Sequence, residues 1–167
     1  MITLVLGGAA SGKSEVAETL AARAGGVVTY VATLIEGDDE DLAARIRAHR
    51  ARRPAPWATV EVSGGSLPDT LAHIPGTVLV DSLGPWVAGA PDMWVDASAL
   101  CAALCDRDGD SVVVSEEVGW GVHPTSEAGR AFRDALGRVN QVVAAVADEV
   151  LLVVAGRTLR LEPGPRR

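Results

Sequence analysis

A glycine-rich loop with one lysine, at residues 7–14, follows the first apolar run of the chain and satisfies the spacing G-x-x-x-x-G-K-[ST]. Glycine at positions 7 and 12 lets successive backbone N–H groups turn toward an anion, and the helical pattern that begins at residue 14 adds positive potential. The chain has 15 basic residues, and Lys13 is the only lysine among them. The loop therefore predicts a nucleotide-phosphate site in which Lys13 contacts the β- and γ-phosphates. The predicted nucleotide-binding residues of the loop are Gly7, Gly8, Ala9, Ala10, Ser11, Gly12, Lys13 and Ser14.

Acidic residues follow two of the apolar runs and are candidates to hold the Mg²⁺ that such a loop binds with its nucleotide. Asp81 ends the run 77–81, and Glu116 and Glu117 follow the run 111–115. A carboxylate at the end of a neighbouring strand can hold the ion together with the loop hydroxyl. Each of these acids could instead be a solvated loop residue beyond a strand. The predicted metal-binding residues are Ser14, Asp81 and Glu117.

A second candidate for chemistry is a histidine in a basic stretch. Residues 38–53 have acids at their start and arginines at their end, which is the arrangement that the helix dipole favours, and Pro54 would end such a helix. Neighbouring guanidinium groups favour a neutral His49, which could attack a phosphorus atom and form a covalent intermediate. The alternative is a surface helix whose histidine only contributes to its C-terminal cap. The arginines beside His49 are Arg47, Arg50, Arg52 and Arg53.

Short β-branched runs alternate with segments of helical periodicity along the chain. The clearest helix covers residues 126–147, where apolar residues recur every three or four positions and leave arginines for solvent. This alternation predicts an α/β fold with a largely parallel sheet and helices on both faces. The stretch 84–93 contains two prolines and is predicted to be a loop. The predicted strands are 2–7, 26–32, 59–62, 77–81, 111–115 and 149–156.

Length and composition limit the class of protein. A chain of 167 residues that is 48% hydrophobic fits one globular domain over residues 1–167, and no apolar stretch approaches the roughly 20 residues of a membrane span. The short first apolar run does not read as a signal peptide, so we expect a cytoplasmic protein. The net charge of −7 disfavours a nucleic-acid binder and favours small substrates. Cys101 and Cys105 are expected to pack on one helical face as small hydrophobes.

The motifs and their order resemble the bifunctional adenosylcobinamide kinase/adenosylcobinamide-phosphate guanylyltransferase family of cobalamin biosynthesis. The likeness runs through nearly the whole chain and is carried by LVLGGAASGKSEVAE, ARIRAHRARRPAPW, VLVDSLGPWVA and EEVGWGVHP, among other stretches. It implies a P-loop NTPase-like fold and a homo-oligomer, with a trimer as the expected state. It also implies two reactions. A nucleoside triphosphate, GTP or ATP, phosphorylates adenosylcobinamide, and GTP then donates GMP through a histidine to adenosylcobinamide phosphate, which gives adenosylcobinamide-GDP and pyrophosphate.

The resemblance also implies roles for individual residues. His49 matches the guanylylated histidine of the family, and Glu61 and Asp81 match acidic positions near the nucleotide. We assign Glu61 to the N–H groups of guanine, although it could equally be an exposed member of an alternating strand. The positions that match a nucleotide-contacting turn are Ala32, Thr33 and Leu34. The positions that match the phosphate-binding stretch after the histidine are Arg50, Ala51, Arg52 and Arg53.

The chain departs from the family pattern at two places in the predicted site. Ala10 stands where the family often has arginine, which removes one phosphate contact. Glu116 stands where the family often has asparagine, which adds negative charge near the nucleotide.

Two other functions use the same loop. A small-molecule kinase without guanylyl transfer needs only the loop and its acids, and His49 would then be incidental. A GTP-binding regulatory module commonly reads guanine with the motif N-K-x-D. The only asparagine of this chain is Asn140, and its only lysine already lies in the loop. The regulatory module is therefore the weaker alternative.

Overall fold

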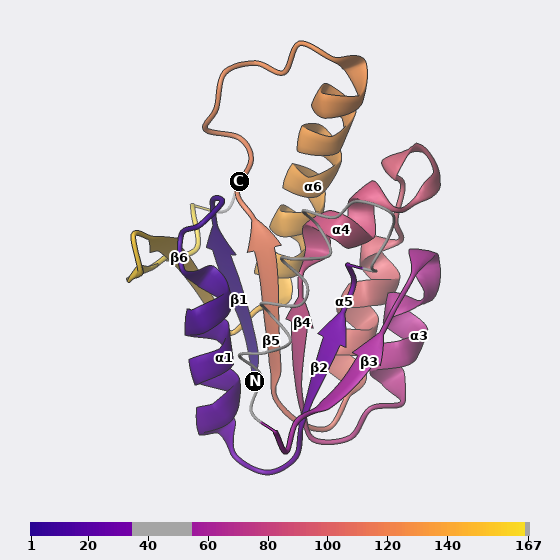
Figure 1. Cartoon of the computed structure of the whole chain (residues 1–167), viewed down its shortest axis with the longest axis vertical. Helices are drawn as coiled ribbons and strands as arrows, with labels where there is room; N and C mark the ends of the chain where they lie inside the picture. The colour runs from indigo at the N-terminus through magenta and orange to yellow at the C-terminus, as the bar shows by residue number, and fades with distance from the viewer. Residues whose placement is uncertain (35–54, 166–167) are drawn as a thin grey trace.

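A seven-stranded sheet forms the centre of the protein (Figure 1). The computed structural model describes residues 1–34 and 55–165. The strands lie in the order β3-β2-β4-β5-β1-β6-β7, and every neighbouring pair is parallel except β6 and β7. The largely parallel sheet expected from the sequence is thus confirmed. The strands are β1 (Ile2–Gly7), β2 (Val28–Ala32), β3 (Ala58–Glu61), β4 (Thr77–Asp81), β5 (Ser111–Glu116), β6 (Glu149–Val154) and β7 (Arg157–Arg160).

Helices cover both faces of this sheet. On one face, α1 packs its buried Ala17 and Ala21 against strand residues such as Val5. On the other face, the helices formed by residues 67–72, 83–88, 97–106 and 127–146 pack against alternate strand residues, among them Leu4 and Val113. Successive strand residues point to opposite faces, so a strand covered on both sides is apolar throughout. The helices within the described ranges are α1 (Lys13–Ala24), α3 (Leu67–Ala72), α4 (Leu83–Ala88), α5 (Ala97–Asp106) and α6 (Glu127–Val146), with short 3₁₀ turns at Gly64–Ser66 and Pro91–Met93.

The strand register brings the predicted site residues to one edge of the sheet. Gly7 at the end of β1 pairs with Glu116 at the end of β5. Asp81 ends β4, which is the neighbour of β5 on its other side. Because parallel strands end at the same edge, the glycine loop and both carboxylates meet there. No helix among the described residues has both the length and the apolarity that crossing a membrane requires.

The predicted loop at residues 84–93 is wrong over much of its length. Residues 83–88 form helix α4, which buries Leu83, Trp86 and Val87 at helical spacing. Pro85 lies in the first turn of this helix, where the missing N–H has no intrahelical partner to lose. The two prolines therefore mark the start of a helix and of a 3₁₀ turn rather than one long loop.

The predicted last strand and the cysteine pair also need correction. The run 149–156 ends as a strand at Val154, because Ala155 and Gly156 have positive φ angles of 50° and 71° and turn the chain into the antiparallel strand β7. Cys101 is buried in α5, but Cys105 is exposed, so the two do not pack together as core residues. Burial, and secondarily the neighbouring Cys105, raises the pKa of the Cys101 thiol.

One arginine connects two segments of the chain at the edge of the sheet opposite the site. The guanidinium of Arg107 donates from Nη2 to the carbonyls of Ile74 at 2.7 Å and Gly76 at 2.8 Å. Its Nη1 donates to the carbonyl of Asp110 at 3.0 Å and to the hydroxyl of Ser111 at 3.1 Å. Burial lowers the pKa of Arg107, while nearby acids act in the opposite direction. Arg107 thus connects the segment before β4 to the start of β5.

Replacing Arg107 with alanine is expected to lower the free energy of unfolding by roughly 2–4 kcal/mol, because its four partners lose a charged donor. Chemical denaturation measures this change. The matched control is Arg138→Ala, since Arg138 is exposed on α6 and its loss should change the same quantity by less than about 0.5 kcal/mol. Equal effects of the two substitutions would contradict the proposed role of Arg107.

Candidate active site

The glycine loop lies between β1 and α1, and its glycines are required by close approach and backbone conformation. A side chain at Gly7 would place Cβ 2.5 Å from the Ser11 hydroxyl and 2.9 Å from the Val153 carbonyl. Gly12, at the start of α1, has a φ angle of 90°, which side chains rarely allow. The Ser11 carbonyl accepts a hydrogen bond from the Gly156 amide at 2.8 Å, so the β6–β7 turn supports the loop. The spacing of the motif therefore has a local structural cause.

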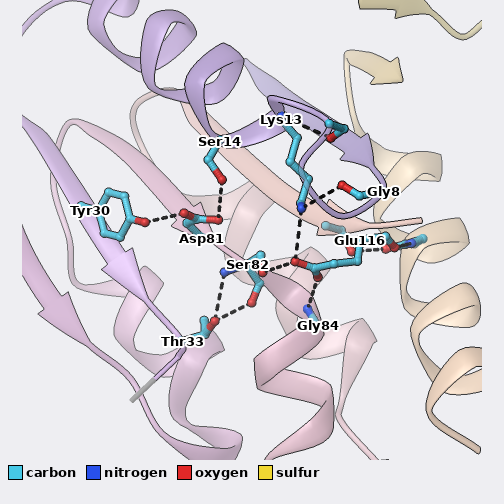
Figure 2. A network of polar contacts seen from close by, with 12 residues as sticks. Gly8, Lys13, Ser14, Tyr30, Thr33, Asp81, Ser82, Gly84 and Glu116 are labelled. Carbon is cyan, nitrogen blue, oxygen red and sulfur yellow. Dashed lines mark hydrogen bonds and ion pairs between the residues drawn. The ribbon is translucent and has the colours of Figure 1, made fainter. Parts of the chain in front are cut away.

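Lys13 is the first residue of α1, and its side chain points back over the loop (Figure 2). Its ammonium lies 3.4 Å from the Gly8 carbonyl and 3.8 Å from Oε1 of Glu116. The Lys13 side chain is only 13% exposed. This places a positive charge beside the helix N-terminus, where backbone N–H groups also favour an anion.

A carboxylate and a hydroxyl meet beside the lysine. The Ser14 hydroxyl donates to Oδ1 of Asp81 at 3.5 Å, and the hydroxyl of Tyr30 donates to Oδ2 (Figure 2). Tyr30 comes from β2 and is buried, so it fixes the Asp81 carboxylate from the side of the sheet. The predicted pairing of Ser14 with an acid at the end of a neighbouring strand thus corresponds to a contact in the structure.

These two residues have the donor chemistry that Mg²⁺ requires. Magnesium prefers hard oxygen ligands, and in nucleotide enzymes it is held by one or two protein oxygens together with phosphate oxygens. Ser14 and Asp81 supply a hydroxyl and a carboxylate oxygen 3.5 Å apart. Among residues 1–34 and 55–165, no cluster of three or more His, Cys, Asp or Glu could hold a metal ion. The Ser14 hydroxyl and the Asp81 carboxylate thus fit a Mg²⁺ ion whose remaining ligands are phosphate oxygens and water.

The two neighbouring glutamates at the end of β5 have different partners. Glu116 accepts hydrogen bonds from the Ser82 hydroxyl at 2.7 Å and the Gly84 amide at 3.0 Å, in addition to its ion pair with Lys13 (Figure 2). Glu117, the predicted metal ligand, donates its backbone N–H to the Gly7 carbonyl and accepts at Oε1 from the Gly119 amide at 2.8 Å. A metal role for Glu117 stays a prediction.

The residues assigned to the nucleotide-contacting turn lie at the end of β2, and Glu61, assigned to guanine, lies at the end of β3. Ala32 is buried and pairs in register with Glu61 on one side and Asp81 on the other. The Thr33 hydroxyl donates to the Ser82 carbonyl and accepts from the Ser82 amide at 3.1 Å, which connects β2 to the turn after β4. Leu34 is half-buried, and Glu61 is exposed. The turn and Glu61 therefore share the sheet edge with the glycine loop.

Some predicted site residues lie outside the described part of the chain. They are His49, Arg50, Ala51, Arg52 and Arg53. Their roles remain predictions from the sequence and from the family resemblance.

Several residues of the site were not found from the sequence. Tyr30 contacts the carboxylate of Asp81, and Ser82 and Gly84 contact that of Glu116, but each is an ordinary strand or turn residue by type. Asn140 of α6 is buried; its side chain accepts from Ser115 at 2.6 Å and donates to the Glu116 carbonyl at 3.1 Å. The available signal was that Asn140 is the only asparagine of the chain and lies on the apolar face of its helix.

The sequence matches a family model and curated relatives over nearly the whole chain. The family model described as "Cobinamide kinase / cobinamide phosphate guanyltransferase" matches residues 3–161. The bifunctional adenosylcobalamin biosynthesis protein CobP of Pseudomonas aeruginosa is 38% identical over 174 residues, which covers 99% of each chain. The protein of the same description, CobU, from Salmonella typhimurium is 39% identical over 183 residues, or 97% of this chain and all of that protein.

One solved structure is similar to this chain in its fold but not in its sequence. An ATPase from the type III secretion system of pathogenic bacteria aligns with a TM-score of 0.57 at 12% identity, over 90% of this chain and 50% of that chain. This supports the P-loop NTPase-like fold expected from the glycine loop and the sheet. The full-length matches confirm the resemblance read from the motifs, and the chain belongs to the cobinamide kinase/cobinamide phosphate guanyltransferase family.

Proposed function

We propose that this chain catalyses both reactions for which its family is named. It phosphorylates adenosylcobinamide with a nucleoside triphosphate, and it transfers GMP from GTP to adenosylcobinamide phosphate through a covalent guanylyl-histidine at His49. The observation that carries the proposal is that the glycine loop places the Lys13 ammonium over the Gly8 carbonyl and, at the next residue, a Ser14 hydroxyl that donates to Asp81, within a chain that matches the family over nearly its full length. The trimer implied by the family resemblance and the cytoplasmic location expected from the sequence remain predictions.

The phosphoryl transfer uses groups of the described site. The substrate hydroxyl oxygen attacks the γ-phosphorus, the bond from that phosphorus to the bridging oxygen breaks, and the nucleoside diphosphate leaves. Lys13 and the loop amides stabilise the negative charge that develops on the phosphate oxygens. When bound at Ser14 and Asp81, Mg²⁺ supplies further neutralisation of phosphate charge. The proton of the substrate hydroxyl passes to solvent.

The guanylyl transfer acts at a different phosphorus atom of the same nucleotide. A ring nitrogen of His49 attacks the α-phosphorus of GTP, and pyrophosphate leaves as the bond to the β-phosphate oxygen breaks. A phosphate oxygen of adenosylcobinamide phosphate then attacks the same phosphorus. The P–N bond breaks, which frees the histidine and yields adenosylcobinamide-GDP. We assign the turn at Ala32, Thr33 and Leu34 to nucleotide contact and Glu61 to the N–H groups of guanine.

The fate of labelled phosphate tests the proposal. With γ-labelled GTP or ATP, label should appear in adenosylcobinamide phosphate, which also decides the donor. With GTP labelled at the α-phosphate, label should appear in adenosylcobinamide-GDP. Transfer of γ-label alone would leave a small-molecule kinase without guanylyl transfer, and transfer of neither label would refute the proposed function.

Substitution of Asp81 by asparagine is expected to raise the Mg²⁺ concentration that gives half-maximal phosphoryl transfer by about tenfold, because the amide is a weaker ligand for a hard cation. Titration of the rate with Mg²⁺ at saturating nucleotide measures the shift. Asp106→Asn is the matched control, since Asp106 is exposed at the end of α5. An unchanged Mg²⁺ requirement in Asp81→Asn would remove Asp81 from the metal site.

A further inference from the structure

The carboxylate of Glu116 is held by three groups, one from the glycine loop and two from the start of α4. Oε1 accepts from the Ser82 hydroxyl at 2.7 Å and lies 3.8 Å from the Lys13 ammonium, while Oε2 accepts from the Gly84 amide at 3.0 Å. The side chain is 26% exposed, so the pair with Lys13 is partly shielded from water. Figure 2 shows Glu116 between the loop lysine and the first turn of α4.

The surrounding chain fixes this carboxylate in place. A Cβ added at Gly84 would lie 2.2 Å from Oε2 of Glu116, so the carboxylate occupies space that only glycine leaves open. The backbone of Glu116 is held as well, since Asn140 donates to its carbonyl at 3.1 Å and accepts from the neighbouring Ser115. Glu116 is therefore a rigid anion beside Lys13 and not a mobile surface acid.

A rigid anion next to the phosphate-binding lysine has two effects on nucleotide binding. It holds the ammonium over the loop, so that part of the rotamer entropy of this long flexible side chain is already lost before the nucleotide binds. It also repels the phosphates that must bind to the Lys13 ammonium, because Mg²⁺–GTP is itself an anion. Both effects depend on the charge of Glu116 and on its position.

We propose that Glu116 is a positioning residue for Lys13. In the free enzyme its carboxylate pairs with the Lys13 ammonium, and nucleotide phosphate replaces it there. This inference rests on the proposed function, because it takes the loop to bind a nucleoside triphosphate. Loss of the Glu116 charge removes a competitor for Lys13, so the nucleotide then binds more tightly. A residue that only maintained the fold would weaken binding, or leave it unchanged, when replaced.

The only lysine of the chain gives a direct readout of this contact. Protein labelled with ¹³C at lysine Cε has a single lysine NMR signal, which reports the mobility of Lys13. In the free protein, Glu116→Gln removes the charge, and Gly84→Ala displaces the carboxylate while its charge remains. Both variants should make the Lys13 signal more mobile, and saturating Mg²⁺–GTP should bring all variants to one rigid state. The matched controls are Glu127→Gln, an exposed acid in α6, and Gly137→Ala, where an added Cβ meets nothing within 4 Å.

Equilibrium binding completes the test. Glu116→Gln should lower the Kd of Mg²⁺–GTP by about three- to tenfold, and raising the salt concentration should reduce this gain. An unchanged or weaker affinity, or an unchanged Lys13 signal in both free variants, would overturn the proposal. Wild-type protein that binds no Mg²⁺–GTP would instead refute the proposed function, and the inference would fall with it. Thermal unfolding confirms that each variant is folded.

Discussion

Replacing Lys13 with methionine is expected to lower kcat/KM for phosphorylation of adenosylcobinamide by about a thousandfold or more. Methionine keeps much of the length of the side chain but cannot stabilise charge on the phosphate oxygens. The ammonium lies beside the Gly8 carbonyl and Glu116, over the loop that is expected to bind the phosphates. Steady-state kinetics with labelled nucleotide measures the loss.

Lys13→Arg is the informative second variant. It keeps the charge, but the planar guanidinium does not fit where a compact ammonium lies 3.4 Å from a loop carbonyl and its side chain is only 13% exposed. We expect it to recover only a small part of the activity. Activity near that of the wild type in Lys13→Met would show that the phosphates bind elsewhere.

Replacing His49 with alanine is expected to abolish the covalent guanylyl adduct. Wild-type protein incubated with GTP labelled at the α-phosphate should acquire label that acid removes and base does not, as expected of a phosphoramidate. Guanylyl transfer should fall by at least about a thousandfold, because the nucleophile is lost. Phosphorylation of adenosylcobinamide should change by less than about tenfold, since that reaction occurs at the γ-phosphorus and does not use His49.

The chain provides matched controls for this experiment, because it has three histidines. His73 is the C-terminal cap of α3, where its Nδ1 contacts the Asp69 carbonyl at 2.7 Å. His123 is exposed, and its Nδ1 lies 3.1 Å from a guanidinium nitrogen of Arg133. His73→Ala and His123→Ala should retain the adduct. Persistence of the adduct in His49→Ala would eliminate the proposed nucleophile.

The sequence predicted the centre of the site because its signals are local. The loop motif places Lys13 and Ser14 at the start of a helix whatever the rest of the fold, since its glycines determine the turn. Asp81 followed from a different local signal, an acid directly after an apolar strand. The parallel sheet then brings it to the loop, as the hydrogen bond between Ser14 and Asp81 shows.

The sequence did not predict the groups that hold Glu116 in position, because they come from distant parts of the chain. Ser82 and Gly84 contact Glu116 from 34 and 32 residues away, and Asn140 contacts it from 24 residues away. No periodicity or motif links such positions. Helix α4 was missed for a local reason, since Pro85 in its first turn resembles a loop signal until the burial of Trp86 is known.

The sequence and the structure lead to different expectations for the effect of the Glu116 charge. Read alone, an additional acid near the nucleotide indicates only repulsion. In the structure its carboxylate also pairs with Lys13 and accepts two hydrogen bonds. The effect of the charge therefore depends on neighbours that only the tertiary structure supplies.

A crystal structure with Mg²⁺ and a GTP analogue that resists hydrolysis between the β- and γ-phosphates tests the central claim most directly. The account predicts the β- and γ-phosphates within about 3 Å of the loop amides and of the Lys13 ammonium, with the ion beside Ser14 and Asp81. It also predicts that Lys13 has left Glu116. Phosphates bound away from residues 7–14, with Lys13 still paired to Glu116, would contradict it.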